Sequence, residues 1–190
     1  TSIMAEEQGL TFDQAEFDAA QAESKEASKG GAKQQTSDAV KPDVHDLAHL
    51  EADAAVPKTD DVFKYDTPTV DATVKALFQA HHFVQASSEL GAPEEPFGVL
   101  LDRTNFYAES GGQQADMGVL SLADGSAEFE VTDVQVYNGY VVHVGYLHYG
   151  TLRVGDAVSA TFHEHRRRPL RNNHTGTHIL NFGLREVLGD

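Results

Sequence analysis

AEFEVTDVQVYNGYVVHVGYL, residues 127–147, carries the strongest structural signal in this chain. Two runs rich in Val, Tyr and Phe flank the dipeptide Asn138-Gly139. The tightest β-hairpin turn needs positive φ at both central residues, and Asn followed by Gly adopts these angles at the least cost. The stretch therefore predicts a β-hairpin formed by residues 127–137 and 140–147.

Further strand signals surround this hairpin at intervals of about ten residues, separated by Gly-bearing turns such as Ala123-Asp124-Gly125. They cover residues 69–78, 82–87, 97–101, 118–122 and 157–163. Short strands at this spacing are typical of a small β-barrel, whose closure hides the sheet edges. We expect a mainly β protein with flanking helices (α+β), in which residues 61–165 form a closed barrel that carries a glycine-bearing loop at 102–118.

Residues 1–60 differ from the barrel in composition, being rich in Ala, Glu, Asp, Gln, Ser and Lys. Good helix formers predict a helix over residues 12–29, ended by Gly30-Gly31. A flexible or disordered linker at 30–42 is expected next, and then a short helix at 44–55 capped by Asp43. The region is interpreted as a helical, partly disordered acidic connector.

Residues 166–190 are basic at first and then follow a helical pattern. Asn172 or Asn173 can cap this helix, and Gly189 marks its end. The expected arrangement is a basic linker followed by the first helix of another domain. The apolar residues of this helix should pack mainly against that domain, and the barrel is a second candidate surface for part of them.

The charge of the chain is strongly asymmetric. Its net charge is −16 and its pI about 4.8, which argues against nucleic-acid binding over the whole surface. Five of the 14 basic residues nevertheless lie in residues 166–190. Four of these five form a basic run, Arg166, Arg167, Arg168 and Arg171. This run either contacts phosphates or is a solvated linker. The chain has no Cys, which excludes disulfides and also excludes a thiolate ligand from any metal site that this chain completes alone. No apolar run is long enough to span a bilayer. No membrane or DNA partner is expected, and the sequence predicts no oligomeric state.

His174 and His178 are spaced four residues apart on the expected helix. Residues at this spacing share one helix face, so the two imidazoles form a candidate pair of zinc ligands. The alternative is a pair of partly exposed surface histidines. Thr175 and Thr177 lie in what should be the first turn, where their hydroxyls either contact a ligand or cap the helix.

The loop 102–118 is polar and glycine-bearing within a strand-rich region. Its aromatic residues offer stacking faces for a base, and its glycines allow backbone N–H groups to face a phosphate. A loop that packs Phe106 and satisfies its own polar groups is the favoured interpretation on these residues alone. The candidate lining residues are Phe106, Tyr107, Glu109, Gly111, Gly112, Gln113 and Asp116.

Three segments closely resemble alanyl-tRNA synthetases of the eukaryotic type: LLDRTNFYAESGGQQADMGVL (100–120), RRRPLRNNHTGTHIL (166–180) and NFGLREVLG (181–189). The resemblance implies a barrel similar to that of translation factors, followed by the start of an editing domain that hydrolyses seryl- or glycyl-tRNA. It implies zinc held by His174 and His178 together with a Cys and a His further downstream. It also implies a cytoplasmic parent protein, with a mitochondrial location as a second option, that charges tRNA(Ala) using ATP and Mg.

The chain itself is expected to be an internal fragment with an incomplete zinc site, weak zinc binding and no catalytic activity of its own. One alternative is a stand-alone trans-editing hydrolase of the same superfamily, although the connector argues against it. The other is an RNA-binding barrel without catalysis.

Overall fold

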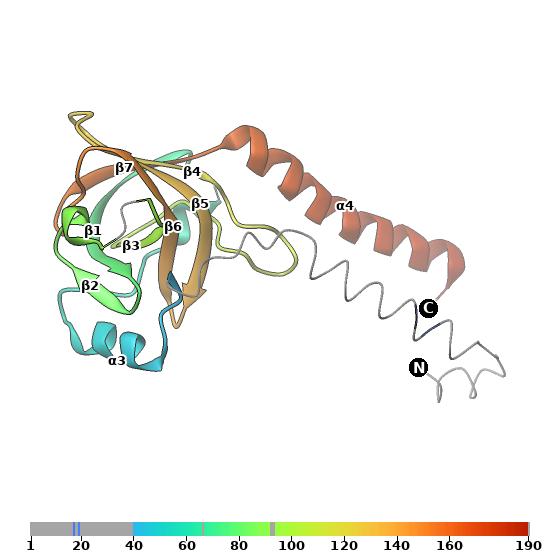
Figure 1. The fold of residues 1–190 in the computed structure, drawn as a ribbon. Helices are drawn as coiled ribbons and strands as arrows, with labels where there is room; N and C mark the ends of the chain where they lie inside the picture. The colour runs from blue at the N-terminus through green and yellow to red at the C-terminus, as the bar shows by residue number, and fades with distance from the viewer. Residues whose placement is uncertain (1–16, 18, 20–39, 66, 92–93, 190) are drawn as a thin grey trace. The chain divides into compact units, whose positions relative to one another are not determined.

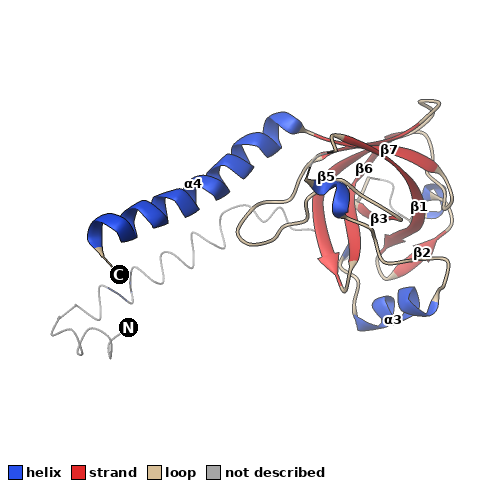
Figure 2. Ribbon diagram, turned by 180° about the vertical axis from the view of Figure 1, so that it is seen from behind, coloured by secondary structure: helices blue, strands red, loops and turns tan. Residues whose placement is uncertain are grey.

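A closed antiparallel β-barrel is the centre of the computed structural model, which describes residues 17, 19, 40–65, 67–91 and 94–189 (Figures 1 and 2). Around the ring, each strand is hydrogen-bonded to the next in the order β1-β3-β6-β5-β4-β7, and β7 pairs back onto β1. The strands are β1 (Thr69–Gln79), β3 (Phe97–Leu101), β4 (Gly118–Leu122), β5 (Glu128–Tyr137), β6 (Tyr140–Tyr149) and β7 (Ala157–Phe162). The predicted barrel is confirmed.

The core of the barrel is formed by the side chains that alternate inward along the strands. Leu77, Phe97 and Phe129 are almost fully buried there, and the rings of Phe97 and Phe129 lie 4.8 Å apart between centroids. β3 is buried along its whole length because a second apolar cluster covers its outer face. That cluster includes Leu50 of α3 (Val44–Ala52). The helix therefore covers part of the barrel wall.

α3 begins where the sequence predicts, at the N-cap Asp43. The Asp43 carboxylate accepts from the backbone N–H of Asp46, and the Asp46 carboxylate accepts from the backbone N–H of Asp43, which completes a capping box. The helix ends at Ala52 rather than at residue 55, because Asp53 adopts an extended conformation.

Two tight hairpin turns fix the register of their strands. Asn138 and Gly139, between β5 and β6, have φ of 49° and 86°, so the predicted turn is confirmed. β1 pairs with β2 (His82–Val84) through a turn at Ala80 and His81, whose φ values of 50° and 63° are unusual for residues other than Gly. Two short 3₁₀ helices complete the described barrel region, η2 (Val62–Lys64) and η3 (Ser87–Glu89).

The turn at Gly139 provides a direct test of this hairpin. Gly139→Ala should lower the free energy of unfolding by about 1–2 kcal/mol, because a Cβ is disfavoured at positive φ. The matched control is Gly91→Ala, where an added Cβ would meet no atom within 4 Å. Chemical denaturation of both variants measures the difference, and an equal effect of the two substitutions would contradict the strained-turn explanation.

The last helix, α4, spans Glu164–Leu188 and starts well before the expected cap at Asn172 or Asn173. The prediction of a basic linker over 166–171 is therefore wrong, since these residues form the first turns of the helix. Pro169 lies inside it and removes one internal N–H donor. The helix nevertheless continues through this position to Leu188.

Most of the predicted helix at 12–29 and of the linker at 30–42 lies outside the described residues. In the described part of the chain, no helix has both the length and the apolar composition needed to cross a membrane.

Candidate functional site

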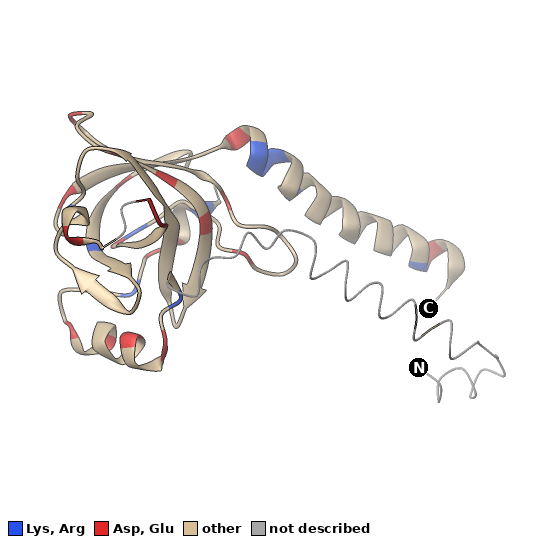
Figure 3. Ribbon diagram, viewed as in Figure 1, with Lys and Arg blue, Asp and Glu red and all other residues tan. Residues whose placement is uncertain are grey.

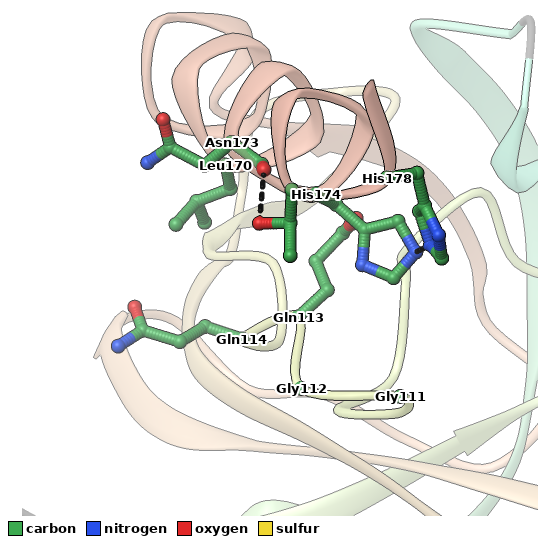
Figure 4. Close-up of a pocket in the computed structure, with 9 residues that line it drawn as sticks. Gly111, Gly112, Gln113, Gln114, Leu170, Asn173, His174 and His178 are labelled. Atoms are coloured by element: carbon green, nitrogen blue, oxygen red, sulfur yellow. Dashed lines mark hydrogen bonds between the residues drawn. The ribbon is translucent and has the colours of Figure 1, made fainter. Parts of the chain in front are cut away.

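His174 and His178 lie one turn apart on α4, and their rings turn toward one another (Figure 4). Their Nε2 atoms are 3.4 Å apart and their ring centroids 5.0 Å apart. Two nitrogens bound to one tetrahedral zinc at about 2.0–2.1 Å must lie about 3.3 Å from one another. The pair therefore has the spacing of one edge of a zinc site, which fits the metal interpretation of the spacing in the sequence.

The histidine pair and the loop 102–118 line one cleft of about 440 Å³ (Figure 4). An added Cβ on Gly111 would lie 3.9 Å from Cε1 of His174, so the tip of the loop lies against the first imidazole. The fold thus brings together two regions that the sequence singles out separately. The lining residues are Gly111, Gly112, Gln113 and Gln114 from the loop, and Leu170, Asn173, His174, Thr177 and His178 from α4.

The tip of the loop is a tight turn made by its two glycines. Gly111 and Gly112 have φ of 59° and 81°, a conformation that other residues adopt only at a cost. Ser110 and Gln113 exchange backbone hydrogen bonds of 3.2 and 3.0 Å across this turn. The two glycines add no side chain to the cleft, whose loop wall is otherwise lined by Gln113 and Gln114.

Arg167 is buried, with 4% of its surface exposed, and it is not available for a phosphate. Its Nε donates to both carboxylate oxygens of Asp116, at 3.1 and 2.9 Å, and its Nη2 donates to the same carboxylate. The guanidinium also lies 3.2 Å from the ring centroid of Phe162. The assignment of Arg167 as a tRNA contact is therefore wrong, because its charge is already neutralised inside the protein.

Phe106 is 1% exposed and packs edge-on against His143, with 5.3 Å between ring centroids. It cannot stack on a base, so the packing interpretation of the loop is correct for this residue. Tyr107 is half-buried and its hydroxyl donates to the Ser110 carbonyl at 3.2 Å. Glu109 is exposed and accepts from the Gln135 side chain at 3.2 Å. Of the loop candidates, Gly111, Gly112 and Gln113 line the cleft.

The sequence profile of the family described as "tRNA synthetases class II (A)" matches residues 1–166. The chain belongs to this family. It is 51% identical to the alanine–tRNA ligase of Candida albicans and 50% identical to the mitochondrial alanine–tRNA ligase of Saccharomyces cerevisiae, over 190 residues in each case. It is 42% identical over 204 residues to the cytoplasmic alanine–tRNA ligase of Bombyx mori.

These matches cover all of this chain but only 19–20% of each of the three relatives, so the chain spans about a fifth of their length. The resemblance to alanyl-tRNA synthetases noted from the sequence is confirmed.

The other arginines of α4 differ from Arg167 in their surroundings. Arg166 donates to the Ala115 carbonyl at 2.5 Å and to the Gln114 side chain at 3.0 Å, so it fastens the loop to the helix. Arg168 and Arg171 are exposed. Figure 3 shows Lys and Arg residues in blue close to the beginning of α4. Arg168 and Arg171 are thus the members of the run whose side chains face solvent.

The sequence predicts that Thr175 and Thr177 lie in the first turn of this helix. In the structure α4 begins at Glu164, so both residues lie in its interior. Thr177 donates to the Asn173 carbonyl at 2.9 Å, one turn earlier in the helix. Neither residue caps the helix.

His143 on β6 was given no role from the sequence, and the structure gives it one. It is fully buried, and Nδ1 donates to the Val99 carbonyl at 3.1 Å because a carbonyl can only accept. Nε2 must then accept from the Thr104 hydroxyl at 2.7 Å, while that hydroxyl oxygen accepts from the backbone N–H of Phe106 at 3.1 Å. Burial lowers the pKa of His143 to about 4. A neutral imidazole therefore fixes the beginning of the loop.

One further group of metal-ligating side chains occurs in the described residues, at the start of α3, and it has a structural explanation. Asp43, Asp46 and His81 each offer one ligand atom, a carboxylate oxygen or a ring nitrogen, and these three atoms lie within 4.8 Å of one another. Asp46 accepts from His81 Nδ1 at 2.8 Å, and this hydrogen bond raises the pKa of His81. The bond ties the β1–β2 turn to the capping box of α3. No third donor from this group or from elsewhere in the described residues joins His174 and His178 in a cluster.

Proposed function

We propose that this chain is part of an alanine–tRNA ligase and that His174 and His178 supply two ligands of a zinc site used in editing. The reaction is the hydrolysis of seryl- or glycyl-tRNA. The observation that carries the proposal is the 3.4 Å separation of the two Nε2 atoms, at the wall of a cleft whose other wall is a glycine turn. As the family resemblance implies, a Cys and a His further downstream would complete the zinc site.

His174 and His178 can supply two of the four ligands of such a zinc site. Zinc in proteins usually has four ligands, and the two imidazoles would provide neighbouring positions of a tetrahedron. Zinc, when bound, supplies a Lewis acid that polarises a carbonyl or lowers the pKa of a water. With two protein ligands, this chain alone should bind zinc weakly.

The cleft suits the aminoacyl end of a tRNA. Gly111 and Gly112 present backbone without side chains, so a ribose carrying an ester can approach the histidine pair closely. The Gln113 amide offers a donor and an acceptor at the same wall. Arg168 and Arg171, exposed on the same helix, are the proposed contacts for tRNA phosphates, since guanidinium groups bind phosphate oxygens well.

The same proposal assigns to the longer protein the attachment of alanine to tRNA(Ala), with ATP and Mg. It also includes a location in the cytoplasm, the mitochondrion or both, since the relatives named above are described as mitochondrial or cytoplasmic.

Two alternatives were a stand-alone editing hydrolase and an RNA-binding barrel without catalysis. The match of the family profile extends over residues 1–60, upstream of the barrel, and favours a ligase. The cleft at the histidine pair favours a catalytic site and therefore argues against an RNA-binding barrel without catalysis.

Substitution of one histidine tests the proposal. His174→Ala should weaken zinc binding to the 190-residue chain on the order of tenfold, or about 1.4 kcal/mol, because one of two ligands is lost. Isothermal titration with zinc measures this, and His165→Ala is the matched control because His165 is an exposed histidine of the same helix.

In the longer ligase, His174→Ala should slow the hydrolysis of seryl-tRNA and leave the attachment of alanine unchanged. Unchanged hydrolysis of seryl-tRNA in the His174→Ala ligase would refute the editing role of the pair.

A further inference from the structure

A single carboxylate closes the base of the loop whose tip faces the histidine pair. The backbone N–H of Tyr107 donates to Oδ2 of Asp116 at 2.7 Å. The backbone N–H of Asp116 donates in turn to the Tyr107 carbonyl at 2.9 Å. These two hydrogen bonds join the segment that leads into the loop tip to the segment that leads out of it, so the position of Asp116 determines where the glycine tip lies.

The same carboxylate holds α4. Arg167 binds it through Nε and Nη2, and both side chains are almost completely buried. Two further guanidinium donors are engaged, since Nη1 donates to the Lys64 carbonyl at 2.8 Å and Nη2 donates to the Asn105 carbonyl at 2.6 Å. A planar guanidinium bound on three sides has a fixed orientation. The first turns of α4 therefore cannot rotate about the helix axis while these bonds persist.

The position of Arg167 on the helix transmits this constraint to the histidines. His174 follows it by seven residues and His178 by eleven, and at about 100° per residue both lie within about 20° of the direction of Arg167. The three side chains form one stripe along α4. A helix whose Arg167 points to Asp116 must point its two imidazoles toward the loop.

Little else in the described structure can set this orientation. Arg167 is the one buried residue of α4, and the large apolar residues further along the helix are exposed, among them Ile179 and Phe182. Arg166 adds two hydrogen bonds to Gln114 and Ala115, on the same loop. The direction of a 25-residue helix thus depends on contacts made in its first turn.

We propose that Arg167 and Asp116 are positioning residues, whose buried ion pair holds the glycine tip of the loop and the histidine pair face to face. The use of this geometry in editing rests on the proposed function above. The geometry itself is independent of it and is tested without measuring any reaction.

The histidine pair can carry a paramagnetic probe for this test. Cu²⁺ binds imidazole nitrogen more strongly than the other divalent first-row metals do. Bound at the pair at a substoichiometric ratio, it broadens the NMR signals of nearby amides. In the unsubstituted chain we expect broadening both in α4 around His178 and at Gly111 and Gly112. His174→Ala should remove both effects, which identifies the signals that depend on this site.

Arg167→Gln should abolish the broadening at Gly111 and Gly112 and retain it within α4. Arg167→Lys, which keeps the charge without the planar fork, should restore part of it, and Arg168→Gln, an exposed neighbour, should leave it unchanged. Asp116→Asn, which keeps the shape of the side chain, should act like Arg167→Gln.

Full broadening of the loop amides in a folded Arg167→Gln chain would overturn the proposal. Loss of the dispersed barrel spectrum in both Arg167→Gln and Asp116→Asn would also overturn it, because the pair would then support the whole fold and not the placement of α4. If His174→Ala fails to affect editing while these NMR results hold, the proposed function fails and the positioning role stands.

Discussion

Asp116→Ala should lower the free energy of unfolding by about 3–5 kcal/mol, because it leaves the Arg167 guanidinium buried without an anion. Asp116 is 2% exposed and Arg167 is 4% exposed, so solvent does not replace the lost partner. The carboxylate also accepts the backbone N–H of Tyr107, and that hydrogen bond is lost with it. Denaturation by urea, monitored at the barrel aromatics, measures the change.

A double variant separates the ion pair from the rest of this effect. Asp116→Leu combined with Arg167→Met removes both charges, so its cost should be smaller than the sum of the two single substitutions. The control is Arg103→Ala, which breaks a half-exposed pair with Asp102 and should cost no more than about 1 kcal/mol. Additive single effects at residues 116 and 167 would show that the two side chains do not stabilise one another.

Acidification should remove about 3 kcal/mol of stability through His143 alone. The pKa of this histidine is about 4 in the folded protein, against its usual 6.5, because burial disfavours the charged ring. Since the folded pKa is the lower one, the unfolded chain binds the proton first as the pH falls. The contribution is complete above pH 6.5 and is lost progressively down to about pH 4, which amounts to about 3 kcal/mol at 1.36 kcal/mol per pH unit.

The comparison of two pH profiles isolates this contribution. His143→Gln should show a weaker decrease in the free energy of unfolding between pH 6.5 and 4 than the unsubstituted chain does. His148→Gln, at an exposed histidine that contacts Glu130, should retain most of the decrease. Parallel profiles for the His143→Gln and unsubstituted chains would contradict the buried neutral imidazole.

The barrel was predictable because its signals are local. Alternation along each strand and the Asn138-Gly139 turn specify hairpins from neighbouring residues. The ring closes through pairing of β1 with β7, which lie far apart in the sequence. This closure was still predictable, because a closed barrel is one of the few arrangements in which short strands leave no exposed sheet edge. The non-glycine turn at Ala80 and His81 gave no composition signal, because its support comes from the contact of His81 with Asp46 on another element.

The site was predictable only in its parts. The helical period pairs His174 with His178, but their meeting with the glycine turn depends on the tertiary fold. The start of α4 and the burial of Arg167 were missed for one reason, since the partner of Arg167 lies 51 residues earlier in the chain. An arginine in a basic run resembles its solvated neighbours until the carboxylate that buries it is known.

The closure of the ring by the first and last strands has a consequence for synthesis on the ribosome. β1 pairs with β7 along residues 69–73 and 157–161, so a nascent chain cannot complete the barrel until residues near 160 have left the exit tunnel. Pairings between such distant segments make folding slow compared with that of helical proteins. During that interval β1 and β4 each expose an unpaired edge, and a chaperone that shields strand edges should associate most strongly with translation intermediates that end before β7.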